Sequence, residues 1–374
     1  MLVILSPASV DSTNVEDEIA FALEEGKIVI PVLYRECRIP FRLRSLHYVH
    51  FKSDYVRSLA ELVRALIPEE KRQARGSWER QDSGTEKALM GVAFVTSKIG
   101  WAVGEAGTIL HTDDGGITWK LQADGTSGYL RSVAFVTAQK GWIVGERGVI
   151  LRTEDGGDTW QEQESGTVED LLSVAFATPD RGWAVGFGGV ILCTEDGGFT
   201  WRRQTSGMES PEPASIIDFR PRLEAVAFRT PSCVCVAADE GTILHTDDGG
   251  SIWRKQIIDT IDTSESFDSV AFATPSLGWI AGMFGSILHT DDAGKTWRRQ
   301  TTDTFTRLFS VAFATPVSGW VVGGGGVILG TSNGGQTWKE YSSGIDENLI
   351  SVAYPTPESA WAVGHEGIIL HWQE

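Results

Sequence analysis

Apolar and polar residues alternate over short stretches of the chain, and a glycine, proline or aspartate follows each stretch. Val, Ile, Phe, Trp and Thr predominate in one group of four such stretches, at Val92–Val95, Trp101–Val103, Thr108–Thr112 and Thr118–Gln122. Alternation with a period of two is typical of β-strands with one buried face, and the turn residues mark the strand ends. The pattern predicts four short antiparallel strands that form one unit.

This unit recurs along the chain. Each copy contains a Val-Ala-Phe phrase or a close variant, whose valines are Val92, Val133, Val174, Val226, Val270, Val311 and Val352. Four strands repeated about every 40 residues are typical of a β-propeller blade, whereas a helical solenoid would need apolar residues three and four positions apart. The sequence therefore predicts a mainly β protein, built as a seven-bladed β-propeller over residues 77–374.

The two ends of the repeat region predict how the ring closes. The seventh copy stops near Trp372 without a fourth strand. The missing piece stands in front of the first copy, because Ser77–Gln81 matches the fourth strands that contain Trp201 and Trp297. We therefore expect the N-terminal strand to complete the last blade, which leaves no open sheet edge.

A second phrase, Thr-x-Asp-x-Gly-x-Thr-Trp, first occurs at Thr112–Trp119 and returns five times; it is the Asp-box. Its acidic position holds Asp114, Asp155, Asp196, Asp248 and Asp292, with Asn333 in the last copy. An aspartate at this spacing lies in a tight hairpin, where its carboxylate can accept backbone N–H bonds. A catalytic site needs one unique constellation rather than six equal copies, so a structural role is predicted.

Residues 1–67 follow a different pattern, and residues 68–76 are a polar, charged stretch that is typical of a linker. Continuous apolar runs predict buried parallel strands, and capping-box spacing between Thr13 and Glu16 predicts the start of a helix. The expected elements are strands at Leu2–Leu5, Ile28–Tyr34 and about Tyr48–Phe51, with a closing helix at about Tyr55–Ile67. These predict a small α/β module.

This module resembles the C-terminal part of a TIR domain, which has a flavodoxin-like fold. The resemblance rests on the Leu-Ser-Pro strand end, the segment Ser12–Ile19 and the Ile-Val-Ile-Pro-Val-Leu run. In TIR domains that cleave NAD, a glutamate at the place of Glu18 is catalytic, so the resemblance implies Glu18 as the candidate residue. No cofactor is expected except NAD, and NAD only if the module is complete and active. The chain departs from the family at Asn14, where a Trp is common, and in lacking the family's first strands. A partial domain, a truncated start of the chain and a solvated role for Glu18 all stay open.

The charge of the chain argues against nucleic-acid binding, and its cysteines argue against a metal site. The net charge of −18 comes from the repeats, since residues 1–76 are balanced, and an acidic propeller is not expected to bind nucleic acid. Cys37, Cys193, Cys233 and Cys235 lack metal-ligand spacing, and Cys235 takes the place that Trp183 has in the preceding copy. The sequence therefore predicts no metal site. No apolar run is long enough to span a membrane and no secretory signal begins the chain, so a cytoplasmic protein is predicted.

The span from Trp78 to Trp372 resembles the photosystem II stability/assembly factor family. The residues that carry this resemblance are the repeated Gly-Trp-Ala-Val-Gly-x-x-Gly-x-Ile-Leu-x-Thr-x-Asp-Gly-Gly-x-Thr-Trp units. It implies a non-enzymatic platform that binds newly made reaction-centre protein, often through an arginine-rich surface, in the compartment to which the family is exported. This chain departs in its acidic propeller and its lack of an export signal, which suggests that the scaffold has been reused. Sialidases also carry Asp-boxes, but the repeats offer no convergent Arg, Tyr and Glu set, so hydrolase activity is a weaker alternative.

Topology predicts which face would bind a partner. The second-to-third strand turns and the fourth-to-first connections share one face, and the former vary most in sequence. The candidate partner-binding residues are Arg131, Arg147, Phe187, Phe219, Arg220, Arg222, Phe284, Arg307 and His365. Aromatic anchors and arginines that pair with acidic groups would suit a protein segment, either of a photosystem assembly intermediate or of another TIR domain. Two alternatives remain: ordinary solvated loops, and a TIR-type signalling protein in which the propeller is the sensor.

Overall fold

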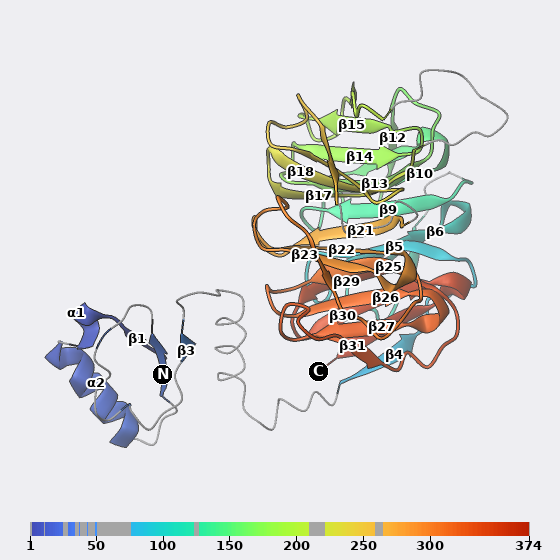
Figure 1. Ribbon diagram of the computed structural model, residues 1–374. Helices are drawn as coiled ribbons and strands as arrows, with labels where there is room; N and C mark the ends of the chain where they lie inside the picture. The colour runs from blue at the N-terminus through green and yellow to red at the C-terminus, as the bar shows by residue number, and fades with distance from the viewer. Residues whose placement is uncertain are drawn as a thin grey trace. The chain divides into compact units, whose positions relative to one another are not determined.

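The structure is a computed structural model of the 374-residue chain. It describes residues 2–10, 12–24, 29–33, 37, 43, 49–50, 76–122, 127–208, 221–258 and 265–373. The chain divides into two compact units, one comprising Met1–Arg75 and the other almost all of Gly76–Glu374 (Figure 1).

The N-terminal unit contains a three-stranded parallel sheet, as predicted. Its order is β1 (Leu2–Leu5), β2 (Ile30–Leu33) and β3 (Val49–His50), and α2 (Thr13–Glu24) lies between the first two strands in sequence. Val3, Leu5, Ile19, Ala22, Val29 and Leu43 form its apolar core. The expected closing helix at Tyr55–Ile67 and residues 68–75 of the expected linker lie outside the described residues.

One helix of this unit was not predicted. Helix α1 (Pro7–Val10) begins with a reciprocal cap, in which Ser6 N donates to Ser9 Oγ (2.8 Å) and Ser9 N donates to Ser6 Oγ (3.3 Å). The capping box usually carries Glu or Gln at its last position, and a serine there gives a weaker signal in the sequence.

The second unit is the predicted propeller, a ring of seven four-stranded antiparallel sheets. Figure 1 shows the blades following one another along the chain, from cyan through green to red. Blades one to three are β5 (Leu89–Phe94), β6 (Gly100–Gly104), β7 (Ile109–Thr112), β8 (Lys120–Gln122); β9 (Leu130–Phe135), β10 (Gly141–Gly145), β11 (Ile150–Thr153), β12 (Gln161–Gln163); and β13 (Leu171–Phe176), β14 (Gly182–Gly186), β15 (Ile191–Thr194), β16 (Arg202–Gln204).

Blades four to seven repeat this order. They are β17 (Leu223–Thr230), β18 (Cys233–Ala238), β19 (Thr242–Thr246), β20 (Arg254–Ile257); β21 (Phe267–Phe272), β22 (Gly278–Gly282), β23 (Ile287–Thr290), β24 (Arg298–Gln300); β25 (Leu308–Phe313), β26 (Gly319–Gly323), β27 (Ile328–Thr331), β28 (Lys339–Tyr341); and β29 (Leu349–Thr356), β30 (Ser359–Gly364), β31 (Ile369–Gln373) with β4 (Ser77–Gln81). In five blades a 3-10 turn joins the second and third strands, at η2 (Glu105–Gly107), η3 (Glu146–Gly148), η4 (Met283–Gly285), η5 (Gly324–Gly326) and η6 (His365–Gly367).

Two of the predicted strand starts in blade one are wrong by more than one residue. The first strand of blade one begins at Leu89 rather than Val92, because the residues before the Val-Ala-Phe phrase also pair with β6. The fourth strand begins at Lys120 rather than Thr118, since the backbone N–H of Thr118 is bound by the Asp-box carboxylate of Asp114 (2.9 Å) and belongs to the turn.

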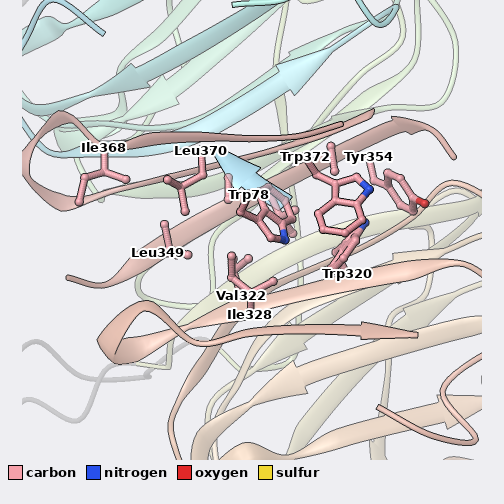
Figure 2. Packing of buried hydrophobic residues seen from close by; sticks show 12 residues of the cluster. Trp78, Trp320, Val322, Ile328, Leu349, Tyr354, Ile368, Leu370 and Trp372 are labelled. Atoms are coloured by element: carbon pink, nitrogen blue, oxygen red, sulfur yellow. The ribbon is translucent and has the colours of Figure 1, made fainter. Parts of the chain in front are cut away.

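The ring closes as predicted, by antiparallel pairing of the propeller's first and last strands. β4 pairs with β31 in the register Ser77↔Gln373 to Gln81↔Ile369. Figure 2 shows the core beside this closure, where the rings of Trp78 and Trp372 meet Trp320 of blade six. The centroids of Trp78 and Trp320 are 5.1 Å apart, edge to face, and those of Trp320 and Trp372 are 4.9 Å apart. Burial of these large rings stabilises the closure.

Neighbouring blades pack through aromatic pairs. A second-strand tryptophan stacks on a first-strand phenylalanine of the next blade, with centroids 3.4 Å apart for Trp101–Phe135 and for Trp142–Phe176. Cys235 takes the tryptophan position in blade four, as predicted, because it pairs with Ala227 as Trp183 pairs with Ala175. The Cys235 thiol is buried, and burial raises its pKa to about 12.

Candidate functional site

Each blade presents its connections at two opposite faces of the ring. The turn between the second and third strands is hydrogen-bonded to the segment that enters the first strand, as in Glu146 N to Tyr129 O (2.9 Å) and Asp239 N to Arg222 O (3.1 Å). The Asp-box turns bond instead to the first-to-second strand turns, as in Gly115 N to Lys98 O (2.9 Å). We call the face made by the second-to-third turns and by the segments entering the first strands the loop face.

A β-bulge occurs near the start of every first strand. In β5 the register shifts between Leu89 and Gly91, which leaves Met90 unpaired, and the other six blades repeat this shift. A bulge redirects the extra side chain. The seven bulge residues are Met90, Arg131, Leu172, Glu224, Asp268, Phe309 and Ile350, and all of them line one cavity of about 340 Å³.

Serines beside the bulge tie the first strands together around this cavity. In five blades the residue after the bulge is a serine whose Oγ accepts a bond from a Val-Ala-Phe valine N–H of the next blade, at 3.2–3.3 Å. The exceptions are Gly91 and Ala225. These bonds hold the cavity wall in a fixed geometry, so the bulge side chains project from a rigid ring. We call this cavity, with the charged side chains around it, the axial mouth.

Two buried carboxylates and two arginines form one side of the axial mouth. Asp268 accepts hydrogen bonds from Arg307 Nε (3.0 and 3.1 Å) and from Arg307 Nη2. Glu224 Oε1 lies 2.9 Å from Arg222 Nη2. Both carboxylate side chains are buried, with 6% of Asp268 and 10% of Glu224 exposed. Blades four, five and six therefore bring two ion pairs together from segments that are distant in sequence.

Burial dominates the electrostatics of these two carboxyl groups. It raises the pKa of Glu224 to about 7 although Arg222 lowers it, and it raises the pKa of Asp268 despite the bonds from Arg307. Asp239 adds to both rises, and Asp268 adds to that of Glu224. The bonds to Asp268 in turn raise the pKa of Arg307. The charge of the axial mouth therefore changes near neutral pH through Glu224.

Each arginine of the axial mouth lies over an aromatic ring. Arg222 Cζ is 4.7 Å from the centroid of Phe187, and Arg307 Cζ is 5.2 Å from that of Phe309. Arg131 Cζ is 5.0 Å from the ring of Tyr129. It also pairs with Glu146 at 3.3 Å. Stacking of this kind holds a guanidinium in place without using its edge N–H groups.

The structure brings together some of the residues predicted to bind a partner, but not all. Arg131, Arg222 and Arg307 line the axial mouth, and Phe187 supports Arg222. Arg147, Phe284 and His365 are exposed and lie in η3, η4 and η6 on the rim of the loop face, outside the cavity lining. Phe219 and Arg220 lie outside the described residues.

Two of these rim residues have an unusual backbone. Arg147 (φ 57°) and Phe284 (φ 56°) lie in the left-handed region, as Ala106, Glu240 and Glu366 do at the same turn position. Side chains other than glycine adopt this conformation at a cost of about 1 kcal/mol. The fold therefore holds the exposed side chains of Arg147 and Phe284 at two of these turns; 56% of Phe284 is exposed, and the nearby Phe305 is 88% exposed.

Sequence reasoning missed Glu224, Asp268 and Phe309. All three occupy the position just before the Ser-Val-Ala-Phe phrase or its variant, which varies from copy to copy while the residues after it barely change. A single variable position inside a constant repeat was the signal that could have found them.

The Asp-boxes form the same bonds in each complete copy. Asp155 Oδ1 accepts from Thr159 N (2.9 Å) and from Thr153 Oγ1 (2.7 Å), and Oδ2 accepts from Thr159 Oγ1 (2.6 Å). The bonds from Thr159 lower the pKa of Asp155 to about 2. Asp114, Asp196 and Asp292 make the equivalent set; Asp248 keeps the N–H bond at Ile252. All the bonds of these carboxylates serve the turn itself.

The N-terminal candidate residue, Glu18, is exposed on α2. Within the described ranges, no group of three or more His, Cys, Asp or Glu side chains is arranged to hold a metal ion. No helix among the described residues is long and apolar enough to cross a lipid bilayer.

The fold and the axial mouth define a seven-bladed Asp-box β-propeller, a class in which side chains on the loops and around the axis give specificity to a fixed ring. The chain belongs to the family of the photosynthesis system II assembly factor YCF48, whose family model matches residues 70–164, 213–305 and 300–373. A TIR-domain model matches residues 1–65, in line with the expected N-terminal module.

Solved structures similar to the chain include two of YCF48. One, described as YCF48 bound to D1 peptide, is 22% identical with a TM-score of 0.64, and the match covers 79% of this chain and 95% of that one. YCF48 from Cyanidioschyzon merolae is 21% identical with a TM-score of 0.65, covering 79% and 99%. A streptogramin B lyase, 12% identical with a TM-score of 0.67, covers 80% and 98%. These likenesses show the fold. The search of curated proteins found no match.

Proposed function

We propose that the propeller is a non-enzymatic protein-binding platform that captures an acidic segment of a partner protein at the axial mouth. The observation that carries the proposal is the convergence of Arg131, Arg222 and Arg307 around one cavity on the loop face, each over an aromatic ring. Arginine and aromatic side chains are enriched among the residues that dominate binding energy at protein interfaces.

The partner chemistry follows from the planar, five-donor guanidinium, which matches a carboxylate. The exposed Phe284 and Phe305 extend the site onto the rim, because their loops are joined by the bond from Gly285 N to Thr306 O (2.9 Å). A segment that places acidic groups at the mouth and apolar groups on this rim fits both features. A relative in the same family is described as bound to D1 peptide, which makes a photosystem assembly intermediate the first partner to test.

The test measures binding of that D1 peptide, labelled with rhodamine, by fluorescence anisotropy. We expect the triple variant Arg131→Gln, Arg222→Gln, Arg307→Gln to lose about 100-fold or more in affinity, about 3 kcal/mol, because it removes several charge-assisted bonds. The matched control replaces Arg202, Arg254 and Arg298, which are exposed on the outer strands β16, β20 and β24. Equal losses in both triple variants would refute a site at the axial mouth.

A TIR-type signalling role is the second candidate, with the propeller as sensor. It is favoured by the TIR match over residues 1–65 and by the exposure of Glu18. In this case the N-terminal unit would hydrolyse NAD or pair with another TIR domain. NAD consumption at high protein concentration tests it: turnover that Glu18→Gln abolishes and that the neighbouring Asp17→Asn leaves intact supports an enzyme. Absence of turnover in the full chain, or turnover unaffected by Glu18→Gln, counts against Glu18 catalysis.

A further inference from the structure

The two ion pairs of the axial mouth differ in how completely they are formed. Arg307 binds Asp268 through Nε and Nη2 together. Arg222, by contrast, touches Glu224 only at 2.9 Å from Nη2 to Oε1, without hydrogen-bond geometry. Among the described residues, Glu224 Oε1 receives no hydrogen bond and Arg222 Nε donates none. One pair is therefore closed, and the other leaves a buried donor and a buried acceptor without a hydrogen bond.

The surroundings of Glu224 explain why this pair is loose. Its side chain is 10% exposed and that of Arg222 is 40% exposed, so the arginine reaches solvent while the carboxylate stays inside. The charged groups that act on Glu224 are Arg222, which precedes β17, Asp268 on β21, Asp239 after β18 and Arg307 before β25. Two of these four groups are carboxyls, which oppose its ionisation.

We propose that Glu224 is an internal competitor for Arg222: in the free protein its carboxylate occupies the guanidinium, and a partner's carboxylate replaces it while Glu224 takes up a proton. The inference rests on the proposed function, because it assumes that the loop face receives an acidic segment. The exchange balances without another reactant. One carboxylate replaces another at Arg222, and the proton that neutralises Glu224 comes from solvent.

Binding of a carboxylate at Arg222 and protonation of Glu224 favour each other. Burial raises the pKa of Glu224 to about 7 in the free protein. A second carboxylate at Arg222 removes the cation that favours ionised Glu224 and adds a negative charge nearby, so it raises this pKa further. The complex then holds more protons than the free protein, and affinity increases as pH falls. Suppose that binding raises the pKa of Glu224 by one unit. The affinity at a pH below the pKa of Glu224 in the free protein is then about tenfold higher than the affinity at a pH above the pKa of Glu224 in the complex.

The cavity also suits the aliphatic stem of a carboxylate. Met90, Leu172 and Ile350 form apolar parts of its wall, so a carboxylate on a short aliphatic stem has apolar surface to contact. The chain carries a net charge of −18, which opposes the approach of nucleic acid. Such a carboxylate can be an acidic side chain or the end of a chain, and the test separates these two sources.

The test uses three rhodamine-labelled hexapeptides in anisotropy titrations between pH 6 and 8.5 at constant ionic strength. Amidated hexaglutamate carries only side-chain carboxylates, hexaglutamine with a free C-terminus carries only a terminal one, and amidated hexaglutamine carries none. Probe carboxylates stay ionised over this range, since their pKa values are near 4. We expect at least one charged probe to bind the wild type about tenfold more tightly at pH 6 than at 8.5, and the amidated hexaglutamine not to bind.

Variants show which residue causes the pH dependence of probe binding. Glu224→Gln, which mimics the protonated side chain, is expected to bind at pH 8.5 as tightly as the wild type does at pH 6 and to lose the pH dependence. Arg222→Gln should abolish binding. Glu240→Gln removes an exposed charge from the same blade and should retain the pH dependence. His365→Gln, which removes the exposed histidine of η6, should also retain it.

Two outcomes overturn the inference in different ways. If a charged probe binds through Arg222 with the same pH dependence in wild type and Glu224→Gln, the competitor role is wrong while the proposed binding function stands. If no charged probe binds at either pH, both the inference and a carboxylate-binding loop face are wrong.

Discussion

Replacing Glu224 by glutamine should change how the stability of the propeller depends on pH. The pKa of this carboxyl is about 7 in the folded protein, against an ordinary value of 4.5, because burial disfavours the charged form. The folded protein therefore holds more protons than the unfolded chain between these two values. It follows that the free energy of unfolding falls as pH rises through this window. Glutamine cannot ionise, so the variant should not show this loss.

The size of the effect follows from the pKa difference. Roughly 2.5 units at 1.36 kcal/mol each give about 3 kcal/mol, as an upper value, because polar groups that rearrange around the ionised carboxylate reduce it. The Glu224→Gln variant should be up to about 3 kcal/mol more stable than the wild type at pH 8.5, and this advantage should vanish near pH 4. Half-buried histidines such as His111, whose pKa burial lowers, act in the opposite direction but cancel in the comparison.

Urea denaturation of both proteins at pH 4.5, 6, 7 and 8.5 measures the difference directly. The matched control is Glu240→Gln, which removes a charge from an exposed turn of the same blade and should track the wild type at every pH. Parallel pH profiles for wild type and Glu224→Gln would show that the carboxyl is not held neutral by burial, and the reasoning about the axial mouth would fall with it.

Other variants test the ring and its turns. Trp78→Ala should destabilise the propeller by about 3–5 kcal/mol, because the side chain is 6% exposed beside the closure; chemical denaturation measures this, and a loss under 1 kcal/mol would contradict it. Asp155→Asn should lower the free energy of unfolding by only about 1 kcal/mol at pH 7, since the carboxylate is near the surface. The pKa of Asp155 is lowered to about 2 in the folded protein, so this difference should disappear as pH falls from 4 to 2. Cys235 and Cys193 should resist alkylation by iodoacetamide in the folded protein and react in urea, as mass spectrometry can show, because burial raises both thiol pKa values; rapid labelling without urea would contradict the packing.

The sequence predicts the ring well because its information is repeated. Seven copies of one phrase establish the blades, and the match between Ser77–Gln81 and two later fourth strands predicts the closure, which the pairing of β4 with β31 confirms. Strand bounds are less well predicted, since Thr118 keeps the β-propensity of a strand residue while its N–H is bound by Asp114.

The axial mouth could be predicted only in part. Arg131, Arg222 and Arg307 stand on the expected face because the strand order alone decides it. Their acidic partners could not be foreseen, because Arg307 and Asp268 come from different blades and meet only when the first strands converge on the axis. Burial of Glu224, and hence its raised pKa, depends on the same convergence and has no local signal.

The pairing of β4 with β31 has a consequence for how the protein is made. β4 leaves the ribosome before any complete blade, yet β31, its partner, follows only after the first six blades. Until then Trp78 has no place to be buried, and the growing propeller has an open sheet edge at each end. Translation must pass β31 before the ring can close, so a product that stops before β31 retains both edges and is exposed to aggregation and proteolysis.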